Sequence, residues 1–240
     1  NMASTVIKNW DNKTWLSSSS YINSFNKFLI KETKLNKNSK ILDIGCGRGK
    51  IIGSLSLKLR LKNKPIGIDL VNHKDKDKRI TFKKVDALSF FRDNKKRFDL
   101  ILVKQTVHLL QINQIKILLK KMSKSLNIKG KIFIFMLNPN NNEIPNFKLM
   151  KKKLLISLKR DKEILGLISS LYPKRTLKNF SYKVEITKET YIKMIKKKYI
   201  STLLSLSNKQ ILNGINEIDF KYGKKLRFSD KLICIIIKNI

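Results

Sequence analysis

The chain has 240 residues and a formal net charge of +36, because 53 Lys and Arg stand against 17 Asp and Glu. The length suits a single domain over residues 1–240, and 42% hydrophobic content is enough for a sizeable core. No apolar run approaches the roughly 20 residues that cross a bilayer, and the two cysteines have no metal-ligand spacing. We therefore expect a cytoplasmic protein with no membrane partner and no metal, and exclude a disulfide-rich secreted one.

The charge by itself suggests nucleic acid as a partner. However, only 8 of the 53 cations are Arg, the residue that nucleic-acid readers favour for its bidentate contacts, and Lys is spread along the whole chain. A chain rich in Ile and Asn and poor in Ala is expected from AT-rich codons. We therefore consider a small molecule a better prediction for the partner of this protein than a nucleic acid.

The first part of the chain alternates short apolar runs with helical patterns. Residues 1–38 form an aromatic segment that leads into a helix with one apolar stripe. Helices are also predicted over 51–59 and 111–126, where apolar residues recur three and four positions apart. Buried strands are predicted at 40–44, 65–70, 80–85, 98–103 and 130–137. This alternation favours a mainly parallel sheet with helices on both faces.

The pattern changes after residue 137. Residues 138–177 are interpreted as a helical lid insertion, with two helix-like apolar sets broken near 159–162. A strand follows at 180–186, then a helix over 187–198, a helix that starts at the capping box of Ser207 and Gln210, and a last strand at 232–237. The predicted fold is α/β, with a doubly wound, mainly parallel, seven-stranded sheet and a lid.

The segment 41–50, Ile-Leu-Asp-Ile-Gly-Cys-Gly-Arg-Gly-Lys, joins the first strand to a helix. A dinucleotide-binding G-x-G-x-x-G would need glycine where Lys50 stands, and a P-loop would need glycine at Ile44 and Ser or Thr at Ile51. The remaining D-x-G-x-G-x-G pattern resembles the first motif of class I S-adenosylmethionine-dependent methyltransferases. This resemblance implies a Rossmann-like methyltransferase fold, S-adenosylmethionine as cofactor and S-adenosylhomocysteine as product.

Acidic residues at three successive strand ends fit such a cofactor. Asp43 can receive the amino group of its methionine part, and Asp69, at the end of the next strand, can accept the ribose hydroxyls. Asp86 resembles the family position that bonds the adenine amino group. The predicted cofactor-binding residues are Asp43, Gly45, Cys46, Gly47, Gly49, Asp69, Leu70, Asp86, Ala87, Lys104 and Gln105.

The fourth strand, 98–103, resembles the family segment that faces the transferred methyl group. It places Lys104 and His108 as catalytic candidates, with His108 able to serve as a base near neutral pH. The strand lacks the Asn/Asp-Pro-Pro-aromatic motif of enzymes that methylate exocyclic amines of bases. This absence again lowers the nucleic-acid alternative.

The segment 185–218 looks like the C-terminal part of small-molecule methyltransferases of the trans-aconitate methyltransferase-like group. We predict methyl transfer to a small-molecule acceptor, with an anionic metabolite among the expected classes. The alternatives are an RNA or other nucleic-acid methyltransferase and a non-catalytic cofactor-binding module. The predicted substrate-binding residues are Trp10, Trp15, Tyr21, His108, Lys198 and Tyr199.

Overall fold

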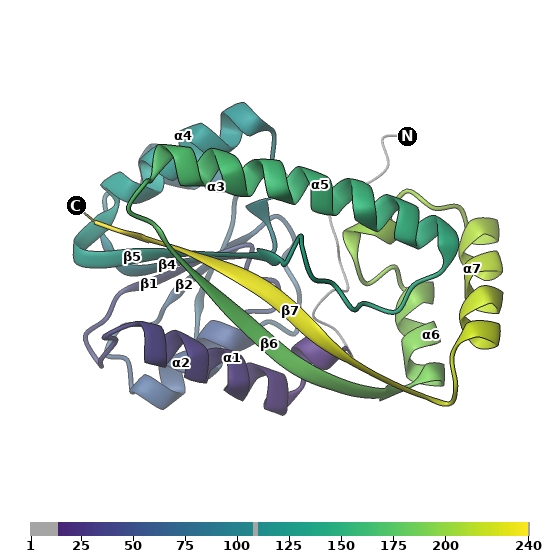
Figure 1. The fold of residues 1–240 in the computed structure, drawn as a ribbon. Helices are drawn as coiled ribbons and strands as arrows, with labels where there is room; N and C mark the ends of the chain where they lie inside the picture. The colour runs from purple at the N-terminus through teal and green to yellow at the C-terminus, as the bar shows by residue number, and fades with distance from the viewer. Residues whose placement is uncertain (1–13, 108–109, 240) are drawn as a thin grey trace.

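Seven strands form one sheet in the computed structural model, which describes residues 14–107 and 110–239 (Figure 1). Along the sheet the order is β3-β2-β1-β4-β5-β7-β6, with β7 antiparallel to both of its neighbours and the other pairs parallel. The strands are β1 (Ile41–Ile44), β2 (Ile66–Asp69), β3 (Thr81–Lys84), β4 (Phe98–Lys104), β5 (Leu126–Leu137), β6 (Thr176–Thr187) and β7 (Lys225–Lys238). The predicted doubly wound, seven-stranded sheet is confirmed.

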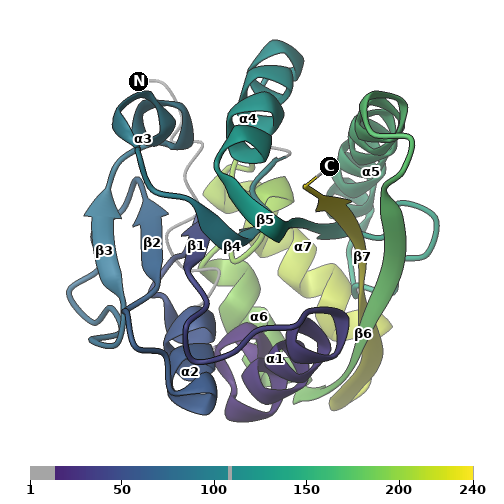
Figure 2. The same cartoon turned by 90° about the vertical axis from the view of Figure 1, so that its left-hand side faces the viewer.

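Helices cover both faces of this sheet. Helices α1 and α2 lie on one face, and α3, α4 and α5 lie on the other, as the end-on view of Figure 2 shows. The helices are α1 (Ser19–Glu32), α2 (Lys50–Leu59), α3 (Ala87–Asp93), α4 (Ile112–Lys124), α5 (Lys148–Leu171), α6 (Lys188–Lys196) and α7 (Asn208–Lys221), with short 3-10 helices η1 (Trp15–Ser17) and η3 (Ser201–Leu203). None of the helices in the described ranges is both long and apolar enough to cross a membrane.

The apolar runs form central strands because both of their faces are buried. Every residue of β1 is buried, and its side chains alternate between two cores. Ile41 belongs to the core under α1 and α2, whereas Leu42 and Ile44 belong to the core under α3, α4 and α5. The two cores together fix the sheet and leave the carboxyl ends of its parallel strands at one edge.

Helices α6 and α7 sit beyond that edge, at one end of the molecule (Figure 1). They are inserted between β6 and β7, which pair in antiparallel register from Thr176 to Thr187. The predicted caps are present: Thr187 accepts a hydrogen bond from the backbone N–H of Thr190, and Ser207 and Gln210 form a capping box.

The predicted break in the lid segment is wrong, since α5 runs without interruption for 24 residues. The charged run at 159–162 lies within the helix, where Lys159, Arg160 and Lys162 are exposed while Asp161 continues the buried stripe of Leu158 and Ile164. The segment 138–177 also ends inside β6, which begins four residues earlier than the predicted strand at 180.

Candidate functional site

The turn between β1 and α2 depends on three glycines with left-handed backbone conformations. Gly45, Gly47 and Gly49 have φ angles of +74°, +57° and +73°, which residues with side chains rarely adopt. A Cβ atom on Gly45 would stand 2.4 Å from Cγ2 of Thr106, so there is no space for a larger residue. The predicted glycine pattern thus brings bare backbone to the carboxyl edge of the sheet.

Hydrogen bonds tie this turn to the end of β2. The backbone N–H groups of Gly45 and Cys46 both donate to the carbonyl of Ile68, at 2.9 and 3.0 Å. The Asp69 carboxylate accepts from the backbone N–H of Gly47 at 2.8 Å and from that of Val71 at 3.1 Å. Asp69 therefore holds the turn in place while it also lines the cavity described next.

A single cavity runs from the strand ends to the segments beyond them. Its first part, called here the cofactor half, is lined by Gly45, Asp69, Leu70, Asp86 and Ala87. Its second part, called here the acceptor half, is lined by Trp15, Tyr199, Ser201, Thr202, Asp161 and Asp230 among others. Lys104 and Gln105 also line the cavity. The predicted residues at the ends of β2, β3 and β4 are thus brought together in one cavity.

Asp86 ends the cofactor half as the N-cap of α3. Its carboxylate accepts hydrogen bonds from the backbone N–H of Ser89 at 2.9 Å and from the Ser89 hydroxyl at 2.6 Å. These two bonds hold the pKa of Asp86 below its ordinary value, so the carboxylate is charged at neutral pH. The cavity is therefore lined here by a carboxylate that is held in place, that of Asp86, and by the first residue of α3, Ala87.

Asp43 is buried in β1, and its Oδ1 atom has no hydrogen-bond partner within the described ranges. Burial raises the pKa of the Asp43 carboxyl well above its ordinary value; the charge of Asp69 adds to this and that of Lys104 opposes it. Asp43 does not line the cavity, and neither do Cys46, Gly47 and Gly49. The structure places these four residues in the strand and turn that shape the site.

Lys104, at the end of β4, is buried and linked to its neighbour. Its Nζ atom donates to Oε1 of Gln105 at 2.9 Å and lies 5.1 and 5.3 Å from the ring centroids of Tyr21 and Phe25. Gln105 itself has a φ of +53°, an uncommon conformation that often marks a functional turn. Lys104 and Gln105 therefore line the cavity as a hydrogen-bonded pair.

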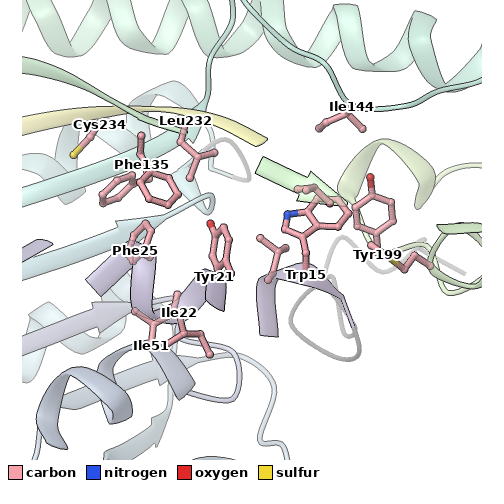
Figure 3. Close-up of a cluster of buried hydrophobic side chains, with 14 of the residues drawn as sticks. Trp15, Tyr21, Ile22, Phe25, Ile51, Phe135, Ile144, Tyr199, Leu232 and Cys234 are labelled. Atoms are coloured by element: carbon pink, nitrogen blue, oxygen red, sulfur yellow. The ribbon is translucent and has the colours of Figure 1, made fainter. Parts of the chain in front are cut away.

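The predicted aromatic residues have different positions. Trp15 and Tyr199 line the cavity with ring centroids 5.5 Å apart, and Figure 3 shows them beside Ile144. Tyr21 instead lies in the core beside Phe25 and is not a lining residue, so its predicted contact with substrate is not supported.

Lys198 also does not line the cavity, because its Nζ atom donates to the carbonyl of Leu206 at 2.7 Å. This bond closes a turn at the end of α6, where Lys198 has a φ of +50°. Two further predicted site residues, Trp10 and His108, lie outside the described residues.

Sequence reasoning missed two buried acids of the acceptor half. Asp230 lies in β7 at an inward position of the alternation Leu226, Phe228, Asp230, Leu232. Asp161 occupies a core position of the α5 stripe. The sequence did contain a signal for both residues, because each places a charged side chain at a position where the periodic pattern expects an apolar one.

Comparisons with solved structures agree with this fold. The chain is 18% identical to the plantazolicin methyltransferase BpumL in complex with S-adenosylhomocysteine and a monoazolic desmethylPZN analogue, over 97% of this chain and 88% of that one, with a TM-score of 0.51. It is 15% identical to phosphoethanolamine N-methyltransferase 2 of Haemonchus contortus, over 98% and 60% of the two chains, with a TM-score of 0.53. A protein from an antibiotic biosynthesis pathway of Anabaena variabilis gives 14% identity, 88% and 95% coverage, and a TM-score of 0.60.

A search of curated proteins finds no match. The family model described as a methyltransferase domain matches residues 19–180, more than half of the 240-residue chain, and these residues include the glycine turn and the acids of the cofactor half. The chain therefore belongs to the methyltransferase domain family and is an enzyme.

Proposed function

We propose that the enzyme transfers a methyl group from S-adenosylmethionine to a small-molecule acceptor held in the acceptor half of the cavity. The observation that carries this proposal is the continuity of the cavity, which joins the glycine turn and strand-end acids to an interior lined by Trp15, Tyr199 and α5. A concave, mostly apolar cavity with a few polar side chains suits a metabolite better than a nucleic acid strand. The trans-aconitate-like grouping remains a prediction.

The residues of the cofactor half fit S-adenosylmethionine. Asp69 would accept the ribose hydroxyls, Asp86 and Ala87 would contact the adenine, and the bare backbone at Gly45 would lie against the methionine part. Asp43 does not line the cavity, so the contact with the amino group that the sequence suggested for it stays a prediction. Related folds such as BpumL hold S-adenosylhomocysteine, the product that this cofactor leaves.

When bound, the cofactor supplies an electrophilic methyl group on a sulfonium. The chain's own residues then have two tasks: to hold the acceptor in line with that group and to keep water out. Helix α5 packs against η3, and both segments contribute side chains to the lining of the acceptor half. The segments 138–177 and 197–206 together would act as the lid.

The experiment that tests this proposal offers methyl-labelled S-adenosylmethionine to the enzyme with a metabolite extract and, separately, with bulk RNA. We expect label in the small-molecule fraction, because the acceptor half is a concave site lined by side chains from several segments of the chain. The strongly basic chain is itself the reason to include RNA. Label in RNA alone would contradict the proposal.

A further inference from the structure

Three polar side chains of the acceptor half are buried without satisfying all of their hydrogen-bonding atoms. Asp161, Thr202 and Asp230 are 5%, 6% and 2% exposed, and each lines the cavity. In the part of the chain that the structure describes, Oδ1 of Asp161, Oγ1 of Thr202 and Oδ1 of Asp230 have no hydrogen-bond partner. Burying such atoms unpaired is costly, so a partner from a ligand is expected.

The chain supplies only part of what the two carboxylates need. The second oxygen of Asp230 accepts a hydrogen bond from the indole N–H of Trp15 at 2.8 Å. The positive charge that acts on Asp161 is that of Arg160, an exposed residue whose guanidinium donates to the carbonyl of Leu110. Asp230 is thus within electrostatic reach of buried Lys104, whereas Asp161 has no buried cationic partner among the described residues.

The lining of the cavity has more acidic than basic side chains, whereas the molecule as a whole is strongly basic. Among the described residues, its lining contains four carboxylates and one ammonium, although the whole chain carries +36. The ammonium is that of Lys104, which donates to Gln105 and whose charge acts on both Asp43 and Asp230. Asp69 and Asp86 serve the cofactor half, which leaves Asp161 and Asp230 as two buried acids around the acceptor, where burial raises the pKa of both and a cationic ligand would stabilise their charged forms.

We propose that the acceptor is an amine, whose nitrogen is received by the carboxylates of Asp161 and Asp230. This inference rests on the proposed function and replaces the anionic acceptor expected from the sequence. An amine supplies both the positive charge and the N–H donors that the unpartnered oxygens lack. Thr202 can accept one further N–H or bond a neighbouring polar group of the same molecule.

The transfer balances with these residues. The amine loses one proton to a carboxylate, and its lone pair then forms the new N–C bond while the S–C bond breaks and its electron pair stays on sulfur. Burial raises the pKa of Asp161 to about 7, so that this carboxyl can hold the released proton near neutral pH and pass it to water.

The test separates a metabolite extract by cation exchange and offers each fraction to the enzyme with methyl-labelled S-adenosylmethionine. We expect label in the cationic fraction, and a loss of labelling of at least tenfold in Asp161→Asn and in Asp230→Asn. Asn keeps the size of Asp at both positions, and in Asp230→Asn the amide oxygen can still accept the hydrogen bond from the indole N–H of Trp15. The matched control is Glu163→Gln, a neutralised acid on the exposed side of the same helix, which should label like the parent.

Affinity for S-adenosylhomocysteine, measured by calorimetry on all four proteins, separates the two proposals. Equal affinity shows that each variant is folded with its cofactor half intact, and a parent protein that does not bind would overturn the proposed function itself. If the parent binds S-adenosylhomocysteine but the cationic fraction takes up no label, the proposal of an amine acceptor is wrong. The same holds if both Asn variants label that fraction as well as the parent does.

Discussion

At the residue scale, the site depends on glycines whose backbone conformation explains why no larger residue stands there. Gly45 adopts a φ of +74° directly under Thr106, whose hydroxyl donates to the carbonyls of Ile44 and Lys104 at 3.3 and 3.2 Å. The motif at 41–50 predicted this turn because glycine adopts such angles at much lower cost than residues with side chains. It could not predict Thr106, since the contact joins residues that are distant in the sequence.

Gly45→Ala should therefore destabilise the protein. A methyl group 2.4 Å from Cγ2 of Thr106, on backbone with positive φ, is expected to lower the free energy of unfolding by about 2–4 kcal/mol. The control is Gly166→Ala in α5, where an added Cβ meets nothing within 4 Å and should stabilise the helix by about 0.5–1 kcal/mol. Urea unfolding measures both; a neutral Gly45→Ala would refute the strained turn.

At the element scale, α5 shows how a local pattern can mislead. The charged run at 159–162 indicates a break, yet three of its side chains are exposed and Asp161 faces inward. The helix continues because its apolar stripe is long enough to pack on the sheet on either side of this run. A polar residue kept at a core position, as Asp161 is, is better explained by function than by stability.

The raised pKa of Asp161 makes α5 sensitive to pH. In the folded state the Asp161 carboxyl has a pKa of about 7, whereas in the unfolded state it has its lower ordinary pKa. At a pH between these two values, the folded protein still binds a proton that the unfolded chain has lost. The free energy of unfolding should therefore fall as pH rises from about 4 to 7. Relative to the parent, Asp161→Asn should gain on the order of 3 kcal/mol between pH 4 and pH 8.

Urea unfolding of Asp161→Asn and of its parent across this range checks the effect. Glu163→Gln, on the exposed side of α5, should follow the parent at every pH. Parallel stability curves for Asp161→Asn and the parent would mean that the Asp161 carboxyl is not perturbed.

At the scale of the whole molecule, the sequence predicted the sheet better than the cover of the site. Apolar runs at 40–44 and 98–103 are buried on both faces, which any packing of the sheet requires, and they lie within one residue of β1 and β4. The strand predicted at 232–237 is only part of β7, which begins at Lys225. Its first half alternates, and its length is set by pairing with β6.

The acceptor half was the least predictable part for a similar reason. Its lining comes from η1, α5, the segment after α6, and β7, which lie far apart in the sequence. The cofactor half comes instead from consecutive strand ends, whose spacing is regular: Asp69 follows Asp43 by 26 positions, the length of one helix and one strand with their loops. Regular spacing is readable from a sequence, whereas the meeting of distant segments is not.

The central claim is that the glycine turn and the strand-end acids hold the adenosyl cofactor, and calorimetric titration with S-adenosylhomocysteine tests it most directly. We predict one site per chain in the parent and a 10- to 100-fold loss of affinity, about 1.5–3 kcal/mol, in Asp69→Ala. Asp219→Ala, which removes an exposed acid paired with Lys188, should bind like the parent. A parent that does not bind the ligand, or an Asp69→Ala variant that binds it equally well, would contradict the account.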